Sequence, residues 1–292
     1  MSPSSLIAEL TARGPVLTDG AWGTELQARG LVSGELPDFW NLSHPDRVEA
    51  VARAYVDAGS QIVLTNTFQA NRIAAGSHPE REQLAEVNRA GVEISRRAAD
   101  GRARVFASMG PSGKLLLPGQ GDDYGMEEAF REQAEGLASG GPDAIVVETM
   151  SDLTEAGLAV AAAKATGLPV VACMVFDSGK KKDRTMTGVT PTQAAEAMTA
   201  AGADVVGANC GLGVEGYIPI CASLAAATPL PIWIKANAGL PVLEGGEVVY
   251  KTTPEEFADH VDALREAGAR FIGGCCGTNP KFIEALARRL RG

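Results

Sequence analysis

Cysteine is scarce in this sequence of 292 residues, which has only five. Their number is odd, and they are spread between residues 173 and 276. So few thiols do not make the dense framework of paired cysteines that holds small secreted proteins together. We therefore expect a reducing, cytoplasmic location, where a cysteine cluster more often indicates a metal or catalytic site.

Positive charge is also in short supply. The chain has 26 Lys and Arg against 36 Asp and Glu, which gives a net charge of −10 at pH 7. Nucleic acids and anionic membrane surfaces are bound by basic surfaces, so we expect neither as a partner. No window of 18 residues is both apolar and uncharged, which predicts no transmembrane helix. Residues 1–14 lack the basic and apolar regions of a signal peptide.

What the chain does contain is a regular alternation of short apolar runs with longer amphipathic stretches. The eight runs are PVLTDG (15–20), QIVLTN (61–66), RVFASMG (104–110), DAIVVET (143–149), PVVACMVF (169–176), DVVGANC (204–210), PIWIKAN (231–237) and RFIGGCC (270–276). The stretches in which apolar residues recur every three or four positions are 44–59, 81–100, 126–139, 152–167, 190–202 and 253–268. These two periodicities predict strands and helices respectively.

The ends of the predicted helices agree with this pattern. Thr190 and Thr253 are each followed by proline, with Gln or Glu three residues later, which is typical of a helix start. Eight strand–helix units in one chain predict a single (β/α)8 barrel, the TIM-barrel fold, over residues 1–292. A doubly wound sheet is the alternative, although it rarely has eight such regular units. The apolar runs are typical of strands buried on both faces.

Polar residues stand at the ends of most of these strand runs. They are Asp19, Thr65, Asn66, Thr67, Ser108, Glu148, Thr149, Asn209, Cys210, Lys235, Asn237, Cys275 and Cys276. In a (β/α)8 barrel the active site lies at the C-terminal ends of the strands. We therefore expect these distant residues to meet at one mouth.

Three of the strand-end residues are cysteines, and they predict a metal site. Cys210 ends the sixth run, and the adjacent Cys275 and Cys276 end the eighth. Three thiolates are a ligand set for zinc, and three protein ligands leave a fourth position open, as in catalytic sites. Adjacent side chains on a strand normally point to opposite faces, so we expect the surrounding glycines Gly273, Gly274 and Gly277 to provide an unusual backbone.

Other interpretations of these residues remain open. Free cysteine often packs in cores, which is our prediction for Cys173 and Cys221. A glycine-rich turn after the eighth strand is also a common phosphate site. If the three thiolates do hold zinc, the metal is a weak Lewis acid, suited to binding an incoming thiol and lowering its pKa. The predicted chemistry is therefore alkyl transfer to sulfur.

With these motifs in view, the sequence resembles the homocysteine S-methyltransferase family over nearly its whole length. The similar segments are DGAWGTELQARG (19–30), TNTFQAN (65–71), GANCG (207–211), KANAGLP (235–241) and GGCCGT (273–278). The resemblance implies a zinc-dependent methyltransferase, EC class 2.1.1, that moves a methyl group to homocysteine and forms methionine. It implies that Cys210, Cys275 and Cys276 bind zinc and that the homocysteine sulfur takes the fourth position.

The resemblance also assigns substrate residues. Asp19 and Glu148 are expected to hold the substrate ammonium, and the backbone N–H groups of Gly20 and Ala21 its carboxylate. Asn209 is placed behind the metal ligands, and Asn237 near the metal, as a ligand when substrate is absent. The zinc site itself is the catalytic element, and no separate general base is proposed.

The methyl donor is the least determined part of this prediction. Betaine-dependent members have a tyrosine just after the second strand, where this chain has Phe68 and Gln69, and they have a longer C-terminal segment. Betaine is therefore not expected. The segments DGAWGTELQ and MSDLTEA are more similar to the methionine synthase domain, but no folate or cobalamin module is present in the sequence. We expect S-methylmethionine or a methyl-corrinoid protein acting in trans as the donor.

Alternatives from other classes remain. The same site fits methyl transfer to another thiol or demethylation of another donor. Lys235 at a strand end would serve a Schiff-base aldolase, and a non-enzymatic zinc or thiol carrier is a further option. The loops 111–125 and 177–188 have no assigned role. The first would line a donor pocket, contact a partner or pack over the barrel end. The second would cover the mouth, dock an acidic carrier or, by default, be a solvated basic loop.

Overall fold

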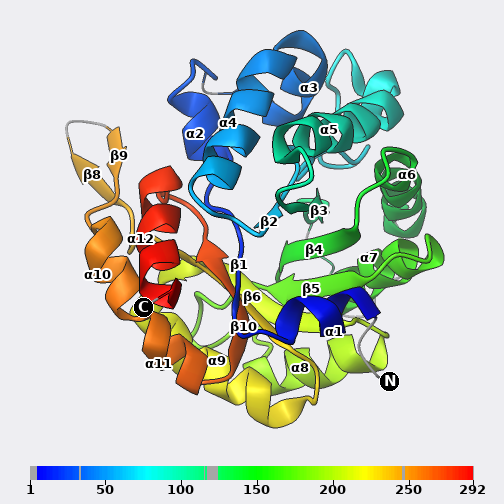
Figure 1. Cartoon of the computed structure of the whole chain (residues 1–292). Helices are drawn as coiled ribbons and strands as arrows, with labels where there is room; N and C mark the ends of the chain where they lie inside the picture. The colour runs from blue at the N-terminus through cyan, green and yellow to red at the C-terminus, as the bar shows by residue number, and fades with distance from the viewer. Residues whose placement is uncertain (1–4, 33, 115, 117–123, 245–246, 292) are drawn as a thin grey trace.

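The computed structural model describes residues 5–32, 34–114, 116, 124–244 and 247–291. Eight parallel strands curve around a common axis, and helices cover their outer side (Figure 1). The strands are β1 (Val16–Leu17), β2 (Ile62–Val63), β3 (Arg104–Met109), β4 (Ala144–Met150), β5 (Val170–Met174), β6 (Val205–Gly213), β7 (Ile232–Asn237) and β10 (Ala269–Gly274). Their order in the sheet is β1-β10-β7-β6-β5-β4-β3-β2.

Main-chain and side-chain hydrogen bonds together complete the ring between the two short strands β1 and β2. The N–H of Gln61 donates to the carbonyl of Leu17 at 2.8 Å, and the Gln61 side-chain oxygen accepts from the N–H of Leu17 at 2.9 Å. Two residues after Leu17, the carboxylate of Asp19 accepts a hydrogen bond from the N–H of Leu64 at 2.8 Å. The predicted (β/α)8 barrel is therefore confirmed, with a seam closed partly by side chains.

The helices that follow the strands match the predicted amphipathic stretches. They are α4 (Pro45–Asp57), α5 (Leu84–Ala99), α6 (Met126–Ser139), α7 (Leu153–Ala165), α8 (Pro191–Ala200), α9 (Val214–Ala227), α10 (Pro254–Asp259), α11 (Val261–Glu266) and α12 (Pro280–Arg291). Thr190 and Thr253 both form complete capping boxes, with Gln193 and Glu256 respectively. Both predicted helix starts are confirmed.

Several elements differ from the sequence pattern. The stretch 253–268 is two helices that meet at His260, and 81–100 starts with the 3₁₀ helix η2 (Arg81–Gln83). Short helices precede the second strand: α1 (Ser5–Thr11), α2 (Gly23–Gln27), η1 (Pro37–Phe39) and α3 (Trp40–Ser43). A separate antiparallel hairpin, β8 (Val242–Glu244) and β9 (Glu247–Val249), follows β7.

The core has an inner and an outer part. The inner part combines aliphatic residues with three aromatic ones, and the ring centres of Phe106 and Phe271 lie 6.0 and 5.3 Å from that of Trp233. Gly207 allows β6 to lie close to the main chain of β7, because a Cβ at residue 207 would lie 2.1 Å from the Trp233 carbonyl oxygen. Cys173 packs in this inner part, as predicted. The larger outer part lies between strands and helices.

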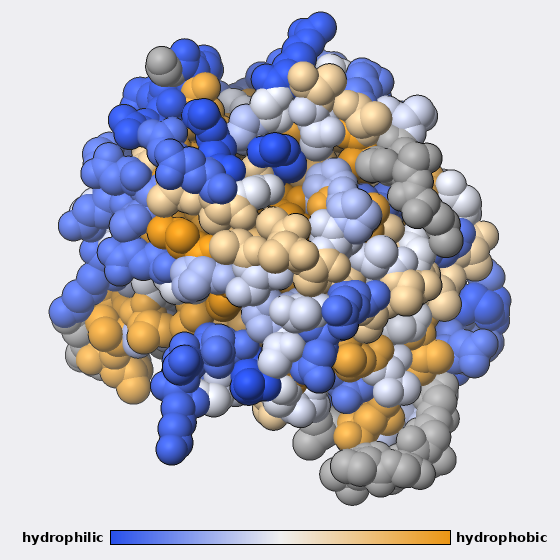
Figure 2. Space-filling model, turned by 90° about the horizontal axis from the view of Figure 1, so that it is seen from below, coloured by the Kyte–Doolittle hydropathy of each residue, from blue (hydrophilic) through white to orange (hydrophobic). Residues whose placement is uncertain are grey.

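The surface is mixed in character. Figure 2 shows hydrophilic residues around the margin of one face, with apolar residues in separate patches between them. Among the described residues, no helix combines the length and the apolar character needed to span a bilayer.

Candidate metal centre

The three strand-end cysteines meet at one point. Cys210 lies near the end of β6, and Cys275 and Cys276 come directly after β10, with β7 between the two strands in the sheet. Their sulfur atoms all lie within 4.8 Å of one another, and those of Cys210 and Cys276 are 3.8 Å apart. All three residues are partly exposed at the barrel mouth. The cluster can therefore be reached from solvent and offers three converging donors.

A local distortion of β6 aims Cys210 at the other two thiols. Its φ is 64°, and that of Gly211 is 65°, inside an interruption of the β6–β7 register. The left-handed region is costly for a residue with a side chain. The Tyr217 hydroxyl stabilises this turn by donating to the carbonyls of Asn209 and Cys210, at 2.9 and 2.6 Å.

Two of the three glycines next to the cysteine pair serve a purpose other than the one we expected. Gly273 and Gly274 belong to the regular strand β10, and a Cβ would lie 2.0 Å from Thr18 Oγ1 or 2.4 Å from Thr278 Oγ1. They are needed for close packing rather than for a left-handed backbone. Gly277 does have a positive φ, of 80°. The conformational strain that we predicted around the pair is thus located at Gly277 and, on the other strand, at Cys210.

The close thiols share protons and charge. Hydrogen bonds from Cys275 and Cys276 stabilise the thiolate of Cys210 and lower its pKa to about 3. The same contact with Cys210 raises the pKa of Cys275 to about 11 and raises that of Cys276 as well. Like charges at this distance repel, so the three groups cannot all ionise without a cation among them. A divalent metal that prefers sulfur satisfies this condition.

A buried amide next to the cluster also fits a metal. Asn237, at the end of β7, is 4 % exposed, and its Oδ1 has no protein partner among the described residues. The strand is held in register with the cysteine pair, because Cys275 N–H donates to the Ala236 carbonyl and Ala238 N–H to that of Cys276. An unpaired buried carbonyl oxygen is costly. Its position beside two ligand-bearing strands agrees with the role predicted for Asn237.

Glu148 is connected to the cysteines through Asn209. Its Oε1 accepts from the Ser108 hydroxyl at 2.5 Å, and its Oε2 accepts from Asn209 Nδ2 at 3.1 Å. The same amide nitrogen lies 4.0 Å from the sulfur of Cys275. Burial raises the pKa of Glu148 to about 7, although the charge of Lys235 opposes the rise. An ammonium group beside this carboxyl would favour its charged form.

Asp19 forms a buried ion pair with Lys235. Its Oδ1 accepts from Lys235 Nζ at 2.5 Å, and its Oδ2 accepts from Trp22 Nε1 and Leu64 N–H, both at 2.8 Å. Burial by itself would lower the pKa of Lys235, but the charges of Asp19 and Glu148 outweigh it and raise the pKa. An ion-paired ammonium is a poor nucleophile, so the contact with Asp19 disfavours Lys235 as the amine of a Schiff base.

The loop after β1 lies against the turn that follows the cysteine pair. The N–H of Ala21 donates to Thr278 Oγ1 at 3.1 Å, and the Ala21 carbonyl accepts from the Tyr55 hydroxyl at 2.5 Å. Gly20 is confined between Thr278 and Tyr55, each 2.8 Å from a Cβ placed there. In this arrangement the N–H of Ala21 is already engaged, so binding of a substrate carboxylate requires Thr278 to turn away.

Tyr250 was not predicted as part of the site. It follows β9, and its ring packs on Gly277, where an added Cβ would lie 2.2 Å from the ring. Burial, followed by the negative charges of Cys276 and Cys210, raises the Tyr250 pKa to about 12. It is the only aromatic residue between Trp233 and Phe257, which is the one signal that the sequence offers.

Two loops near the mouth received predictions. In the loop 111–125, residues 115 and 117–123 lie outside the described residues, whereas Ser112 is anchored by its N–H and hydroxyl to Glu155. The loop 177–188 is mostly exposed, and it is fixed at the buried Thr185 and by the Thr187 hydroxyl, which donates to the Ser151 carbonyl. This arrangement agrees with a solvated basic loop.

Comparison with known proteins gives one consistent family. The family model described as "Homocysteine S-methyltransferase" matches residues 16–290. The chain is 32 % identical to methionine synthase from Mycobacterium tuberculosis over 92 % of this chain, and 30 % identical to that from Mycobacterium leprae over 96 %. It spans about a quarter of the length of these relatives, covering 24 % and 25 % of them.

Solved structures show the same fold. The metallated form of the homocysteine methyltransferase MmuM from Escherichia coli superposes with a TM-score of 0.80 at 24 % identity, covering 98 % of this chain and 99 % of that one. The oxidized form has a TM-score of 0.75 at 26 % identity, covering 94 % and 96 %. Together with the family match over nearly all residues, this places the chain in the homocysteine S-methyltransferase family.

Proposed function

We propose that this protein transfers a methyl group from a donor to the sulfur of homocysteine and so forms methionine. The observation that carries the proposal is the group of three thiols that converge at the barrel mouth from β6 and the end of β10. Membership of the family supports the acceptor and the reaction. We further propose that residues 1–292 act as one homocysteine-binding barrel domain in the cytoplasm.

The metal is proposed to be zinc, held by Cys210, Cys275 and Cys276. When bound, zinc would lower the pKa of a thiol in its fourth position, so that this thiol is a thiolate nucleophile at neutral pH. Asn237 is proposed to be its ligand when substrate is absent, on the strength of the unpartnered Oδ1. The E. coli MmuM structure with the higher TM-score is described as metallated, which agrees with this assignment.

The protein's own residues then bind and orient the amino-acid part of the substrate. We assign the ammonium to Glu148, because this carboxyl lies at a strand end beside Asn209 and is 7 % exposed. Asn209 contacts both Glu148 and Cys275, so it fixes the position of the carboxyl relative to the thiol cluster. The substrate's ammonium and its sulfur are then held at a fixed distance from each other. Such positioning of reactants lowers the entropic part of the barrier.

Asp19, Gly20 and Ala21 keep their proposed substrate roles with a stated condition. In this structure both carboxylate oxygens of Asp19 are occupied, by Lys235, Trp22 and the N–H of Leu64. Asp19 therefore binds the substrate ammonium directly only if its ion pair with Lys235 breaks. The backbone N–H groups of Gly20 and Ala21 take the substrate carboxylate once Thr278 gives up its contact with Ala21. Asp19 otherwise acts by holding Lys235 protonated near Glu148.

The donor is proposed to be S-methylmethionine or a methyl-corrinoid protein acting in trans. The mycobacterial relatives named methionine synthase are about four times as long as the matched region, so they do not decide between the two. Transfer to a thiol other than homocysteine, or demethylation of another donor, is the second candidate, because the three-thiol cluster by itself selects sulfur and not the rest of the acceptor.

One experiment tests the proposal. Zinc-loaded protein is incubated with homocysteine and, separately, S-methylmethionine, methylcobalamin, betaine or S-adenosylmethionine, and methionine is measured. We expect product with S-methylmethionine or methylcobalamin and none after removal of zinc. Full activity of the zinc-free protein would contradict the mechanism. Methylation of another thiol, with none of homocysteine, would contradict the acceptor. Reductive trapping of an added carbonyl substrate on Lys235 by borohydride would favour the aldolase alternative.

A further inference from the structure

The segment after the β8–β9 hairpin brings Tyr250 against the thiol cluster. Tyr250 is partly buried and packs on the main hydrophobic core. Its ring lies against Gly277, because a Cβ at residue 277 would be 2.2, 2.4 and 2.6 Å from three ring carbons. Gly277 directly follows Cys276 in the chain. Packing therefore holds the phenol ring in one place beside the second cysteine of the pair.

The polar end of Tyr250 contacts a sulfur atom. The Tyr250 side chain forms a hydrogen bond with the side chain of Cys276. A phenol is protonated at neutral pH, so its hydroxyl is the donor and the sulfur is the acceptor. The bond becomes stronger when Cys276 is a charged thiolate, as it is in a metal ligand. The ring and the hydroxyl thus have separate contacts, and the change of Tyr250 to phenylalanine removes only the second.

The other two thiols of the cluster also have hydrogen-bond donors, of unequal strength. Cys210 accepts from the N–H of Gly211. Cys275 has a long contact of 4.0 Å with Asn209 Nδ2. That nitrogen donates at the shorter distance of 2.7 Å to the Thr149 hydroxyl, so little of its donor strength is directed at sulfur. The hydroxyl of Tyr250 therefore distinguishes Cys276 from its neighbour in the pair.

These donors matter because the proposed reaction takes place among several sulfur atoms. The following inference rests on the proposed function. All three thiols of the cluster are partly exposed at the mouth, where a methyl donor must also approach. A methylated cysteine is a thioether, which is not among the usual ligands of zinc, so such a reaction would damage the site. Hydrogen bonds to a ligand sulfur withdraw charge from it and change its reactivity.

We propose that Tyr250 is a positioning residue that directs the methyl group away from Cys276. Its hydroxyl donates to the Cys276 sulfur and makes this sulfur a poorer nucleophile. The methyl group then forms its new bond with the acceptor sulfur. The old bond to the methyl donor breaks, and the donor keeps the electron pair of that bond. The acceptor is alkylated, and the ligand set of the metal centre is preserved.

The test uses iodomethane, which needs neither the natural methyl donor nor homocysteine. The attacking sulfur forms a bond to the methyl group, and iodide leaves with the electron pair. The zinc-loaded full chain is treated for increasing times, and tandem mass spectrometry measures the methylation of each cysteine. We expect Tyr250→Phe to raise the rate at Cys276 about fivefold, the effect of one lost hydrogen bond. The rate at Cys275 should change little, because its contact with Asn209 is retained.

A spectrum provides a second readout that ring packing alone would not change. Cobalt(II) is bound in place of zinc, and the sulfur-to-cobalt charge-transfer band is recorded. A sulfur that has lost its hydrogen bond holds its electrons less tightly, so the band of Tyr250→Phe should move to lower energy. The ring of phenylalanine still packs on Gly277, so the variant should fold and bind the metal as the wild type does.

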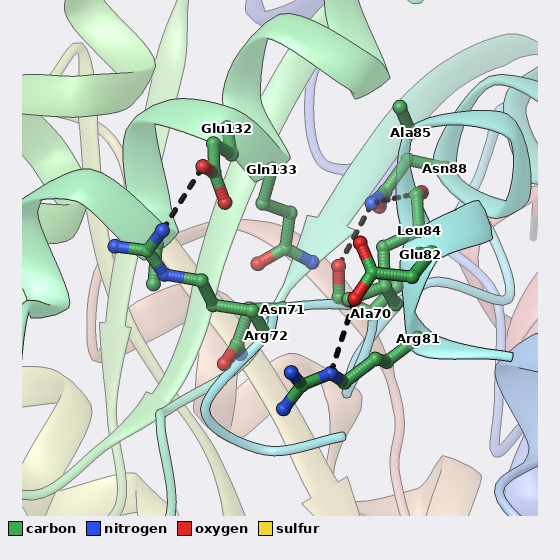
Figure 3. Close-up of a pocket in the computed structure, with 11 residues that line it drawn as sticks. Ala70, Asn71, Arg72, Arg81, Glu82, Leu84, Ala85, Asn88, Glu132 and Gln133 are labelled. Carbon is green, nitrogen blue, oxygen red and sulfur yellow. Dashed lines mark hydrogen bonds and ion pairs between the residues drawn. The ribbon is translucent and has the colours of Figure 1, made fainter. Parts of the chain in front are cut away.

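Tyr124→Phe is the matched control, because it also removes one phenol hydroxyl. Tyr124 is 41 % exposed and precedes Gly125, where an added Cβ would lie 3.5 Å from the Arg72 guanidinium. Figure 3 shows Arg72 with Glu132 at a cavity between α5 and α6, and none of the residues that line this cavity belongs to the metal centre. Methylation rates and the cobalt spectrum of Tyr124→Phe should equal those of the wild type.

Several outcomes would overturn the inference. Equal methylation of Cys276 in Tyr250→Phe and Tyr124→Phe would do so, as would an unmoved charge-transfer band. An equal rise at Cys275 and Cys276 would mean that the whole centre has loosened. Loss of zinc from Tyr250→Phe alone would mean that the hydroxyl holds the metal. A wild-type protein that binds no zinc would instead contradict the proposed function itself, and metal analysis of every sample separates the two failures.

Discussion

At the scale of single residues, Cys275 and Cys221 are the same side chain in two settings. Cys275 faces two other thiols at the barrel mouth. Cys221 is buried on α9, its sulfur 3.6 Å from the Ala267 carbonyl, and burial raises its pKa to about 12. We expect Cys275→Ser to lose bound zinc and methyl transfer together, and Cys221→Ser to change neither. Metal analysis and methionine formation measure the two effects.

Either result can contradict the assignment. If the Cys275→Ser variant still binds a full equivalent of zinc, Cys275 is not a zinc ligand. If the Cys221→Ser variant loses its zinc, zinc binding depends on the stability of the whole fold. The melting temperature of each variant separates such a loss of fold from the loss of a ligand.

Asp38 provides a second prediction, remote from the thiols. It is 1 % exposed; its Oδ1 accepts from the N–H of Gln69 at 2.8 Å, and its Oδ2 has no partner among the described residues. Burial raises the Asp38 pKa from 3.8 to about 7. The folded protein therefore binds the proton more tightly than the unfolded chain, and stability decreases as pH rises from about 4 to about 7.

Asp38→Asn should remove this part of the pH dependence. Near pH 4 the variant and the wild type should have similar free energies of unfolding. At pH 8 the variant should be more stable, by at most about 4 kcal/mol. Urea unfolding at both pH values measures the difference. A variant that loses stability equally at both would show that Asp38 is not buried in its neutral form.

The sequence located some of these residues and missed others for a physical reason. Cys210 and the cysteine pair stand at strand ends, so the fold class by itself predicts that they converge. The short helix with Asp38, and Tyr250 after the hairpin, lie in connecting segments whose path depends on tertiary packing. The engagement of Asp19 by Lys235 is likewise a contact between the first and seventh strands, which no local pattern shows.

At the scale of elements, the turn after β10 depends on Gly277. Its φ is 80°, and a Cβ there would meet the ring of Tyr250 at 2.2 Å. Gly167, after α7, has the same φ of 80° with nothing within 4 Å of an added Cβ. Gly167→Ala therefore measures the backbone strain alone, roughly 1–2 kcal/mol. Gly277→Ala adds the clash, because the ring lies where the methyl group would be.

We expect Gly277→Ala to lower the free energy of unfolding by clearly more than Gly167→Ala, and to weaken zinc binding as Tyr250 is displaced from the cluster. Denaturant unfolding and competition with a zinc chelator provide the two readouts. Equal losses of stability in the two variants, with zinc affinity unchanged in both, would mean that Tyr250 does not pack on this turn.

The sequence predicted the strands and helices of the barrel but missed some of the connecting elements. All eight predicted strand runs overlap a strand of the barrel, because buried parallel strands are apolar on both faces, and the helices were found because one face is buried. The break between α10 and α11 at His260 was not, since the apolar spacing continues through it. The β8–β9 hairpin was missed because its strands have only three residues each and one of their apolar residues, Leu243, is 77 % exposed.

At the scale of the whole molecule, the metal site joins segments that are distant in the chain. Cys210 and the cysteine pair flank β7 in the closed ring, so an ion held by both restrains β6 against β10. Glu148 on β4 adds a third strand through Asn209. Zinc binding should therefore be coupled to the stability of the whole barrel rather than to one loop.

This coupling can be measured with its proton dependence. A ligand of the folded state at 100 times its dissociation constant stabilises by about 2.7 kcal/mol, so zinc should raise the melting temperature and a chelator lower it. Binding must also displace the protons of Cys275 and Cys276, whose pKa values are raised without metal. Because each proton competes with the metal, the stabilisation should increase as pH rises from 6 to 8.

Cys275→Ser again supplies the comparison for the melting experiment, and Cys221→Ser its matched control. The first should show little stabilisation by zinc at any pH, and the second the full effect with the same pH dependence as the wild type. A stabilisation of Cys275→Ser equal to that of Cys221→Ser would place the ion elsewhere. A stabilisation that does not change with pH would mean that zinc binding releases no protons from the thiols. The cluster of three sulfur atoms would then not be the metal site.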